Sequence, residues 1–487
     1  MAGADIIIRN TQLIDGTGGP MTAADVAITG DRISAIGPNL GTDAAEQIDA
    51  GGLALAPGFI DAHTHDDRIV LADPGMACKI SQGVTSVVTG NCGISIAPVR
   101  LSERPPAPLD LIGQEPKAFF ATFSEYFAAL DQSPPAVNVI AQVGHSSLRV
   151  MAMSDLNRTA TAAEIETMRS ALRQSLEQGA AGFSTGLAYQ PAHEASTEEI
   201  EALAEVVAEF KGFHSTHMRD EGAGVMDSLA ETFRIGRTAE IPVIVSHHKC
   251  AGIPNHGKSE ITLPYIEKAL ANQRITLDCY PYVASSTVLD PYRVQEASNT
   301  VIAWSTTRPE FAGQDLTDIA SEMGVDIAQA IEALQPAGAI YFNMHEDDVR
   351  RILSFPQTMI GSDGLPHDEH PHPRLWGTFP RVLGHYSRDV GLFGLEEAVR
   401  KMTSLTAQTF GIKDRGVVAE GCFADLVLFD PKEIIDSATF AEPVKPAAGI
   451  SRVFVNGSCV WQEGAATGLR PGRGLQRQGL TPLNFAA

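Results

Sequence analysis

The sequence contains no long hydrophobic run and no closely paired cysteines. Its apolar runs fall well short of the ~20 residues of a membrane-spanning helix, and its first residues, MAGADIIIR, hold no basic stretch before a long apolar core. We therefore expect neither a membrane anchor nor a signal peptide. The six cysteines show no Cys-x-x-Cys spacing, so free thiols in a reducing cytoplasm fit them better than a disulfide framework.

Basic residues are scarce relative to acidic ones. Lys and Arg number 36 against 59 Asp and Glu, which gives a formal net charge of −23 at pH 7. Nucleic acid and anionic membranes repel a chain this acidic, so we expect neither as a partner. An anionic substrate would need a local cluster of cations that acts against the overall charge.

The two ends of the chain share a β-type pattern. Short β-type runs separated by Gly- and Asp-rich breaks occupy the first ~55 residues, and similar runs return at residues 424–430 and 453–460. With 487 residues, the chain is long enough for a large α/β domain and an accessory domain. We predict that residues 1–57 and 415–480 form one small β-sandwich domain built from both termini.

Between these ends, apolar β-type runs alternate with helical patterns, which is typical of βα units around a parallel sheet. A Thr-x-x-Glu start at Thr161 predicts a helix over residues 161–178. Eight strand candidates predict an α/β fold, a TIM-like (β/α)8 barrel over residues 58–414, with its chemistry at the carboxyl ends of the strands. Between strands seven and eight, residues 283–345 are too long for a βα connection, so we expect an inserted lid or subdomain. The eight candidates end near His65, Cys92, His145, Thr185, His217, His247, Tyr280 and Asp363.

The first two strand ends carry metal-binding side chains. His63 and His65 lie two residues apart after an apolar run, so they share one face and form half of a metal site. Cys92 stands at the exit of the second strand, where a thiolate would favour zinc. Each of these residues taken singly is better explained as a buried structural residue, so the prediction depends on further ligands.

Later strand ends supply those ligands. His217 ends the fifth strand and His247 the sixth; of the neighbours at 247 and 248 we choose His247, because Lys249 then shares its face. Asp363 ends the eighth strand, where a carboxylate can bind metal, accept a proton from water and return it to a leaving group. A turn-forming Asp-Gly pair without a chemical role is the alternative at Asp363.

Two cations and a phenol form a second group. Lys249 follows His247, Tyr280 ends the seventh strand, and Arg374 lies in the loop after Asp363. Each alone would usually be a surface charge or a packing group. Together, beside a metal site, they suit a carboxylate of the substrate.

Long motifs of this chain resemble those of the D-aminoacylases (N-acyl-D-amino acid deacylases) in the amidohydrolase superfamily, and the resemblance covers nearly the whole length. One of them, GNCGIS, stands where many relatives use a carboxylated lysine as a bridging metal ligand. The motifs are Pro57 to Asp67, Gly90 to Ser95 (GNCGIS), Thr216 to Gly222 (THMRDEG), Ser246 to Lys249 (SHHK), Leu277 to Tyr282 (LDCYPY) and Ile360 to Tyr386.

The resemblance implies specific roles for the site residues. It implies one tightly held zinc ion bound by Cys92, His217 and His247, and a weaker second position at His63, His65 and Asp363, with sharing of Cys92 between the two positions left open. It also implies Asp363 as the general base. The implied contacts to the substrate carboxylate are Lys249, Tyr280, Ser286 and Arg374, of which Ser286 comes from the resemblance alone.

From this resemblance we expect zinc-dependent hydrolysis of N-acyl-D-amino acids, with apolar side chains favoured, by a cytoplasmic monomer or small homo-oligomer. A cyclic-amide hydrolase of the hydantoinase or dihydroorotase kind is the first alternative. The absence of a suitable lysine at strand four, residues 182–186, counts against it. A scaffold that kept the barrel and lost the chemistry is the second alternative, but such a protein should lack some ligands, and none is missing here.

Overall fold

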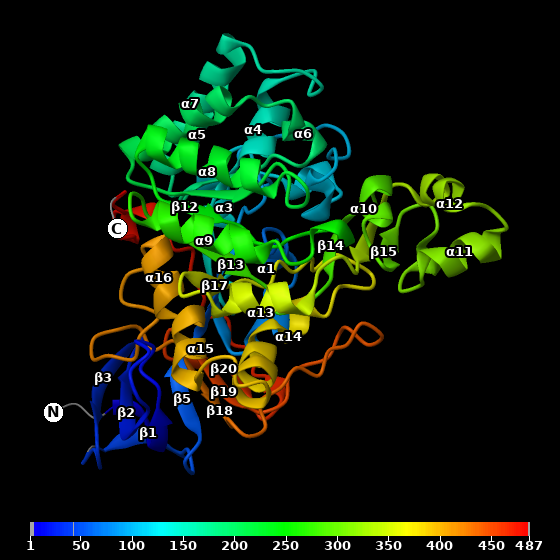
Figure 1. The fold of residues 1–487 in the computed structure, drawn as a ribbon. Coiled ribbons are helices and arrows are strands. Elements are labelled where there is room, and N and C mark those ends of the chain that lie inside the picture. The colour runs from blue at the N-terminus through cyan, green and yellow to red at the C-terminus, as the bar shows by residue number, and fades with distance from the viewer. Residues whose placement is uncertain (1–3, 42, 486–487) are drawn as a thin grey trace.

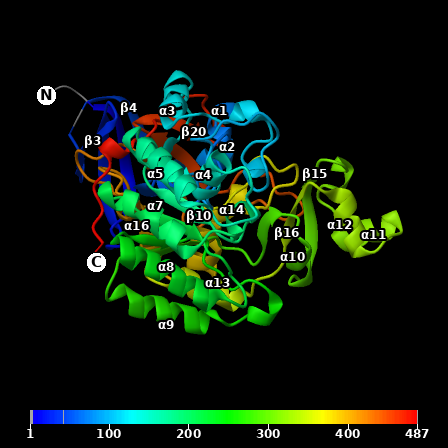
Figure 2. The same ribbon diagram turned by 90° about the horizontal axis from the view of Figure 1, so that it is seen from above.

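Parallel strands in the middle of the chain form a barrel. The structure, a computed structural model, describes residues 4–41 and 43–485, and helices surround the barrel strands in both views (Figures 1 and 2). The strands are β6 (Phe59–Asp61), β7 (Val84–Thr89), β8 (Asn138–Ala141), β9 (Val143–Gly144), β10 (Phe183–Gly186), β11 (His214–His217), β12 (Val243–Val245), β13 (Ile275–Cys279) and β17 (Thr358–Ile360).

The barrel closes through two parallel sheets. One has the order β17-β13-β12-β11-β10-β9 and the other β6-β7-β8. A single residue, Gln142, separates β8 from β9, so together they fill the third position of the ring. The eighth and first positions meet where the Ala62 amide donates to the Ile360 carbonyl at 3.2 Å and where Thr64 bridges Gly364. The predicted (β/α)8 barrel is confirmed.

Helices follow the barrel strands as the alternating pattern predicted. The helix predicted over residues 161–178 is α5, and Thr161 caps it in a reciprocal capping box with Glu164. The helices of the barrel are α1 (Ile69–Ala72), α2 (Ala77–Ile80), α3 (Phe123–Gln132), α4 (His145–Ala152), α5 (Ala162–Glu177), α6 (Gln190–His193), α7 (Thr197–Glu209), α8 (Val225–Ala239), α9 (Ser259–Leu270), α13 (Glu346–Ser354), α14 (Arg374–Arg381), α15 (Leu395–Met402) and α16 (Ser404–Phe410). No helix among the described residues is both long and apolar enough to cross a membrane.

Apolar side chains fill the lower part of the barrel and leave its carboxyl end for polar groups. Buried residues from the strands meet Phe410 of α16 and Leu483 of the C-terminal tail in one cluster. The tail follows the amino ends of the strands, because Leu483 and Thr481 donate backbone hydrogen bonds to Lys211 and Gly411. The strand residues of this cluster include Ile60, Val88, Ile140, Ile244 and Met359.

Both ends of the chain build one nine-stranded sheet. Its order is β21-β20-β19-β18-β5-β1-β2-β3, with β4 paired to β1, so β5 and β18 join the two halves in antiparallel register. The small β domain expected from both termini is therefore one continuous sheet, while its boundaries at residues 57 and 415 stay a prediction. The strands are β1 (Ala4–Leu13), β2 (Thr22–Thr29), β3 (Arg32–Gly37), β4 (Ala44–Asp49), β5 (Ala54–Pro57), β18 (Leu426–Phe429), β19 (Ile450–Val455), β20 (Ser458–Gln462) and β21 (Ala465–Ala466).

The insertion between β13 and β17 has its own sheet and core, and it projects from one side of the barrel (Figures 1 and 2). Its three antiparallel strands have the order β14-β16-β15. A separate apolar cluster that includes Ile302, Ile319 and Leu334 holds the insertion together. Its role as a lid stays a prediction. Its elements are β14 (Ser285–Val288), α10 (Pro291–Gln295), β15 (Thr300–Ser305), α11 (Leu316–Met323), α12 (Ile327–Leu334) and β16 (Ala337–Tyr341).

Candidate metal centre and active site

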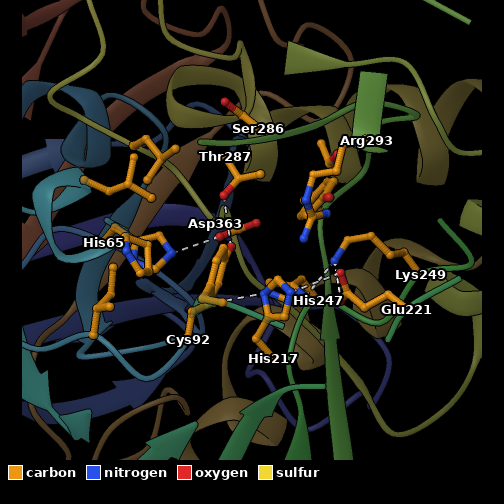
Figure 3. Close-up of a pocket in the computed structure, with 17 residues that line it drawn as sticks. His65, Cys92, His217, Glu221, His247, Lys249, Ser286, Thr287, Arg293 and Asp363 are labelled. Carbon is orange, nitrogen blue, oxygen red and sulfur yellow. Dashed lines mark hydrogen bonds and ion pairs between the residues drawn. The ribbon is translucent and has the colours of Figure 1, made fainter. Parts of the chain in front are cut away.

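Four buried side chains converge at the carboxyl end of the barrel. The ligand atoms of His63, Cys92, His247 and Asp363 all lie within 4.8 Å of one another. The Cys92 sulfur stands between two imidazoles, 3.2 Å from His63 Nε2 and 3.2 Å from His247 Nε2. Figure 3 shows three of these residues, Cys92, His247 and Asp363, facing one another across a single pocket. Residues that are far apart in the sequence therefore form one cluster.

A second group shares His247 with the first. It joins His217, Glu221 and His247, whose ligand atoms also lie within 4.8 Å of one another. Neither ring nitrogen of His217 finds a hydrogen-bond partner among the described residues, although Nε2 lies 3.4 Å from a Glu221 oxygen. A buried imidazole without partners is expected to bind something that the chain itself does not supply.

The chemistry and spacing of these donors fit a zinc ion. Ligands held at about 2.0–2.3 Å around a tetrahedral zinc lie roughly 3.3–3.8 Å apart, and the sulfur-to-nitrogen distances of 3.2 Å are close to that range. Burial raises the pKa of the Cys92 thiol, but His63 and His247 outweigh burial and hold the pKa well below its ordinary value of 9.0. The lowered pKa favours the thiolate, which is the form that binds metal.

The backbone at the strand ends turns these side chains inward. Cys92, His247 and Asp363 have φ angles of +53°, +35° and +49°. Residues other than glycine rarely adopt this left-handed region, and such strain is concentrated at functional sites. Each residue comes two or three positions after its strand, so the chain changes direction where it presents the ligand. The neighbouring His248 points elsewhere, with Nε2 2.9 Å from the Thr262 hydroxyl.

His65 and Asp363 lie side by side at the edge of the cluster. His65 Nε2 is 3.2 Å from Asp363 Oδ1, and His63 Nε2 is 3.5 Å from the same oxygen. The other Asp363 oxygen is 2.8 Å from the guanidinium of Arg374. Burial raises the pKa of Asp363, but Arg374, His247 and His65 hold it well below 3.8, so the carboxylate is ionised.

Of the four residues expected to contact a substrate carboxylate, Lys249, Tyr280 and Ser286 line the same pocket, and Arg374 contacts two of its lining residues, Asp363 and Tyr280. Lys249 Nζ lies 2.7 Å from His247 Nδ1. The hydroxyls of Tyr280 and Ser286 are buried and find no partner among the described residues. Arg374 stacks on the Tyr280 ring at 4.5 Å and donates to the Ser286 carbonyl at 3.1 Å. The structure thus brings all the predicted site residues together, and their individual roles stay predictions.

Three residues of the site were missed in the sequence. Glu221 accepts from Lys249 at 2.6 Å and lies 2.9 Å from His247 Nδ1. Asp278 lies 3.2 Å from His63 Nδ1 and also accepts the His247 backbone amide at 2.8 Å. Both lie in motifs shared with the D-aminoacylases, THMRDEG and LDCYPY. Their acidic side chains could have identified them as hydrogen-bond partners of the metal-binding histidines. The third, Arg293, lines the pocket from the insertion, where the sequence carried no comparable signal.

The rest of the pocket divides by polarity and by origin. Loops of the barrel contribute an apolar wall, and the insertion contributes a wall of hydroxyls and the cation of Arg293. The Tyr189 and Thr287 hydroxyls are joined by a 3.0 Å hydrogen bond across the boundary. The apolar wall consists of Ile94, Pro108, Leu111 and Leu365, and the polar wall of Ser285, Ser286, Thr287 and Arg293.

Comparison with known proteins gives consistent matches over most of the chain. A profile of the amidohydrolase family matches residues 46–259 and 319–461. The chain is 53% identical over 473 residues to a D-aminoacylase of Alcaligenes xylosoxydans xylosoxydans, with 97% of this chain and 98% of the relative covered. It is 50% identical over 477 residues to an N-acyl-D-aspartate deacylase of the same organism, with 97% and 95% covered.

A solved structure matches equally well. It is N-acyl-D-glutamate deacylase from Bordetella bronchiseptica in complex with zinc and a phosphonate inhibitor that mimics the tetrahedral intermediate of the reaction. The TM-score is 0.94 at 47% sequence identity, and the match covers 97% of this chain and 100% of that chain. The likeness therefore includes both domains and the insertion.

Proposed function

Because this chain belongs to the amidohydrolase family, we propose that it is a zinc-dependent deacylase that hydrolyses N-acyl-D-amino acids to a carboxylate and a free D-amino acid. The observation that carries the proposal is the sulfur of Cys92 held between His63 and His247 at the carboxyl end of the barrel. The relatives act on D-amino acid derivatives with different side chains, so the apolar side chain expected from the sequence stays a prediction.

The two clusters of donors overlap the two zinc positions that the resemblance implies but do not coincide with them, because Cys92 groups with His63, His247 and Asp363, and His217 groups with Glu221 and His247. Cys92, His217 and His247 would hold the tightly bound ion, and His63, His65 and Asp363 a weaker second one. When bound, zinc supplies a positive charge that polarises the amide carbonyl and lowers the pKa of water toward neutrality. Glu221 and Asp278 fix the ring orientation of His247 and His63 through the nitrogens that face away from Cys92.

Asp363 carries the proton through the reaction. Its ionised carboxylate accepts a proton from the water that attacks the amide carbon, and it later donates that proton to the leaving amine. Arg374, 2.8 Å away, keeps the carboxylate ionised and fixes its orientation. These two tasks need one group close to both the water and the nitrogen, which the position of Asp363 beside His65 and Cys92 allows.

The cations and hydroxyls beside the metal residues select the hand of the substrate. Lys249, Tyr280, Ser286 and Arg374 would bind the carboxylate on Cα, which fixes one of its substituents. With that group and the acyl carbonyl both held, the two configurations at Cα would direct the side chain to different parts of the pocket. Binding at several fixed points is what converts affinity into stereochemical discrimination.

The proposal is tested by hydrolysis of paired N-acetyl-D- and N-acetyl-L-amino acids with apolar and acidic side chains. We expect the D series to be cleaved and the L series to be poor substrates, and a preference for the L series would overturn the proposal. Metal analysis of the purified protein should find zinc in stoichiometric amount. Its absence would favour the scaffold alternative, and ring opening of a hydantoin in place of deacylation would favour the cyclic-amide alternative.

We further propose a cytoplasmic location and a monomer or small homo-oligomer. The six cysteines are all free thiols in the structure, which suits a reducing compartment. The location is tested by cell fractionation and the assembly by light scattering of the purified protein.

A further inference from the structure

We infer that His372 is a positioning residue, which holds Arg374 in place beside Asp363 by joining the loop after β17 to the insertion. The inference rests on the proposed function, in which Arg374 binds the substrate carboxylate and orients Asp363. His372 lies two residues before Arg374 and is 2% exposed. It acts through Arg374 and does not itself line the pocket that holds the metal residues.

Each ring nitrogen of His372 has a partner that fixes its protonation. Nδ1 lies 3.0 Å from the Arg374 backbone amide, and Nε2 lies 3.0 Å from the Ala284 carbonyl oxygen. Because the amide can only donate and the carbonyl can only accept, the ring carries its proton on Nε2 and donates it to Ala284. Burial and the guanidinium of Arg374 hold the pKa of His372 well below 6.5, so the ring is neutral, as both contacts require.

The segment that accepts from His372 also holds the side chain of Arg374. Ala284 directly precedes β14, and Arg374 Nη2 donates to the carbonyl of Ser286 within β14 at 3.1 Å. Positions 372 and 374 of the loop are thus attached to carbonyls 284 and 286 of the insertion. The backbone and the guanidinium of Arg374 are fixed against one segment, which leaves the guanidinium 2.8 Å from Asp363.

Aromatic side chains from two parts of the chain pack on the ring of His372. Tyr282 and Phe440 meet it edge to face, with ring centroids 5.1 Å and 4.9 Å away. Phe440 belongs to the loop between β18 and β19 of the nine-stranded sheet, and its carbonyl lies 2.8 Å from Nε2 of His370. A ring packed in this way rotates only if its neighbours move, so its two hydrogen bonds keep their directions.

A local capping role does not explain why this residue is a histidine. Asp, Asn and Ser also accept the amide two residues ahead, and they are the residues that turns favour. Their polar atoms lie no farther along the side chain than Nδ1, so they would leave the Ala284 carbonyl without its donor. The second nitrogen of the imidazole is the feature that reaches from the loop to the insertion.

Loss of this bridge should weaken substrate binding through Arg374. A guanidinium that is held less firmly must be ordered again when the substrate carboxylate binds, which reduces the net free energy of binding. A purely structural loss would act differently, because a smaller fraction of folded enzyme lowers the apparent kcat and leaves KM unchanged. The value of KM therefore separates the two roles.

The kinetic test compares His372→Phe, His372→Asn and Arg374→Ala on the best N-acyl-D-amino acid. Phe keeps the size of the ring and removes both hydrogen bonds, and we expect it to raise KM by about tenfold. Asn keeps an acceptor for the Arg374 amide and loses only the contact with Ala284, so KM should rise by about threefold. An unchanged KM in His372→Phe would overturn the inference, and if that variant does not fold, an unchanged KM in His372→Asn would do so.

A double variant shows whether His372 acts through Arg374. His372→Phe combined with Arg374→Ala should have the KM of Arg374→Ala alone, within about twofold, because the guanidinium that His372 holds is already absent. If the two increases in KM multiply, His372 acts on another group and the inference is wrong.

The matched control is His345→Phe. His345 Nδ1 likewise lies 3.2 Å from the amide two residues ahead, that of Asp347, but His345 is exposed and caps α13. Its replacement removes the same kind of local hydrogen bond away from Arg374, so the KM should equal that of the wild type. A rise in KM as large as that of His372→Phe would contradict the inference.

Hydrogen exchange keeps the test independent of turnover. The Arg374 amide is buried and donates to His372, so it should exchange at least about tenfold faster in His372→Phe than in the wild type and stay protected in His372→Asn. Equal rates in His372→Phe and the wild type would refute the inference. If no N-acyl-D-amino acid is hydrolysed, the proposed function fails, while the exchange rates still decide whether His372 holds the segment of Arg374.

Discussion

Asp363 is expected to have two roles, metal binding and proton transfer, which usually belong to different residues. It lies within reach of a metal position through His63 and His65, and it is also the group proposed to move the proton. Its left-handed backbone, with φ at +49°, is tolerated best by Asp and Asn among residues with a side chain. Exchange of this carboxylate for an amide is therefore a clean chemical change.

We predict that Asp363→Asn lowers kcat by about 100-fold or more, the typical loss when a positioned acid or base is removed. The measurement is steady-state hydrolysis of the best N-acyl-D-amino acid, with zinc content determined on the same sample. A fall of less than tenfold, with zinc still bound, would contradict the assigned role.

Glu221 orients the ligands of the tightly held ion. Burial raises the pKa of its carboxyl, but His217, Lys249 and His247 outweigh burial and hold the pKa well below its ordinary value. We predict that Glu221→Gln weakens zinc binding by about 10–100-fold, because it removes the carboxylate that faces His247 Nδ1. Competition with a chelator measures the affinity. The matched variant Glu231→Gln, which changes contacts with Arg219 and Thr197, should bind zinc as the wild type does.

The sequence shows which residues can bind metal, but not all of those that hold them in place. His63, Cys92, His217 and His247 could be found because strand ends of a barrel meet on one rim. Ser286 needed the family resemblance, because one hydroxyl in an insertion has no distinctive spacing. Glu221, Asp278 and Arg293 were missed because their roles depend on distances across the barrel that only the folded chain defines.

At the scale of elements, the turn after β7 decides where the thiolate stands. Gly93 follows Cys92 with φ at +74°, and an added Cβ would lie 2.6 Å from the backbone nitrogen of Gly186 at the end of β10. We predict that Gly93→Ala lowers the free energy of unfolding by about 2–4 kcal/mol, from backbone strain and overpacking together, and lowers zinc content.

The control for this prediction is Gly391→Ala. Gly391 also has a positive φ, +67°, but nothing lies within 4 Å of the added Cβ. Urea unfolding should show only the strain there, about 1 kcal/mol. If both variants lose the same free energy of unfolding, the contact with Gly186 contributes nothing to stability.

Helix α15 carries a buried lysine beneath the barrel strand β17. Lys401 donates to the carbonyls of Phe355 at 2.5 Å and Thr358 at 3.4 Å. Burial lowers its pKa from 10.5 to about 8, so between these two values the unfolded chain binds more protons than the folded protein. The free energy of unfolding contributed by Lys401 therefore rises with pH over that window, by about 3 kcal/mol at most.

We predict that Lys401→Met loses this rise, which appears as a smaller gain in the free energy of unfolding between pH 8 and pH 10.5 than the wild type shows. Urea unfolding at a series of pH values measures it. Lys413→Met, at an exposed lysine, should keep the pH dependence of the wild type. Identical slopes for Lys401→Met and the wild type would contradict the prediction.

Regular elements were predictable where their signals are local. The capping box at Thr161 places the start of α5 correctly, because both of its hydrogen bonds lie within one helical turn. The alternating pattern also gave the barrel, since each βα unit repeats the same signal. The path of the insertion could not be predicted, because β14 pairs with β16, which lies beyond three α-helices and another strand.

At the scale of the whole molecule, the C-terminal tail closes the floor of the barrel. Leu483 is 7% exposed and packs with residues from barrel strands and from α16. We predict that Leu483→Ala lowers the free energy of unfolding by about 2–3 kcal/mol, the usual cost of a cavity at a buried leucine. Leu469, 53% exposed, provides the control, and Leu469→Ala should leave the urea midpoint unchanged.

The tail also marks a limit of sequence reasoning. Residues after Gly464 have few regular elements, yet they are fixed by hydrogen bonds to segments all around the barrel. Their carbonyls and amides pair with Val139, Gly179 and Gly411, far away in the chain. The attachment of the tail could not be predicted from the sequence, because these contacts have no periodic signal.

Because β5 pairs with β18, the sheet built from both termini can be completed only late in translation. The N-terminal strands leave the ribosome first, but the partner of β5 is translated only after the entire barrel and its insertion. Until then, a growing polypeptide presents β5 as an open edge, and such edges invite pairing with other chains. A ribosome that stalls inside the barrel would release a product with this edge uncovered, and chaperones or proteases would be needed to dispose of it.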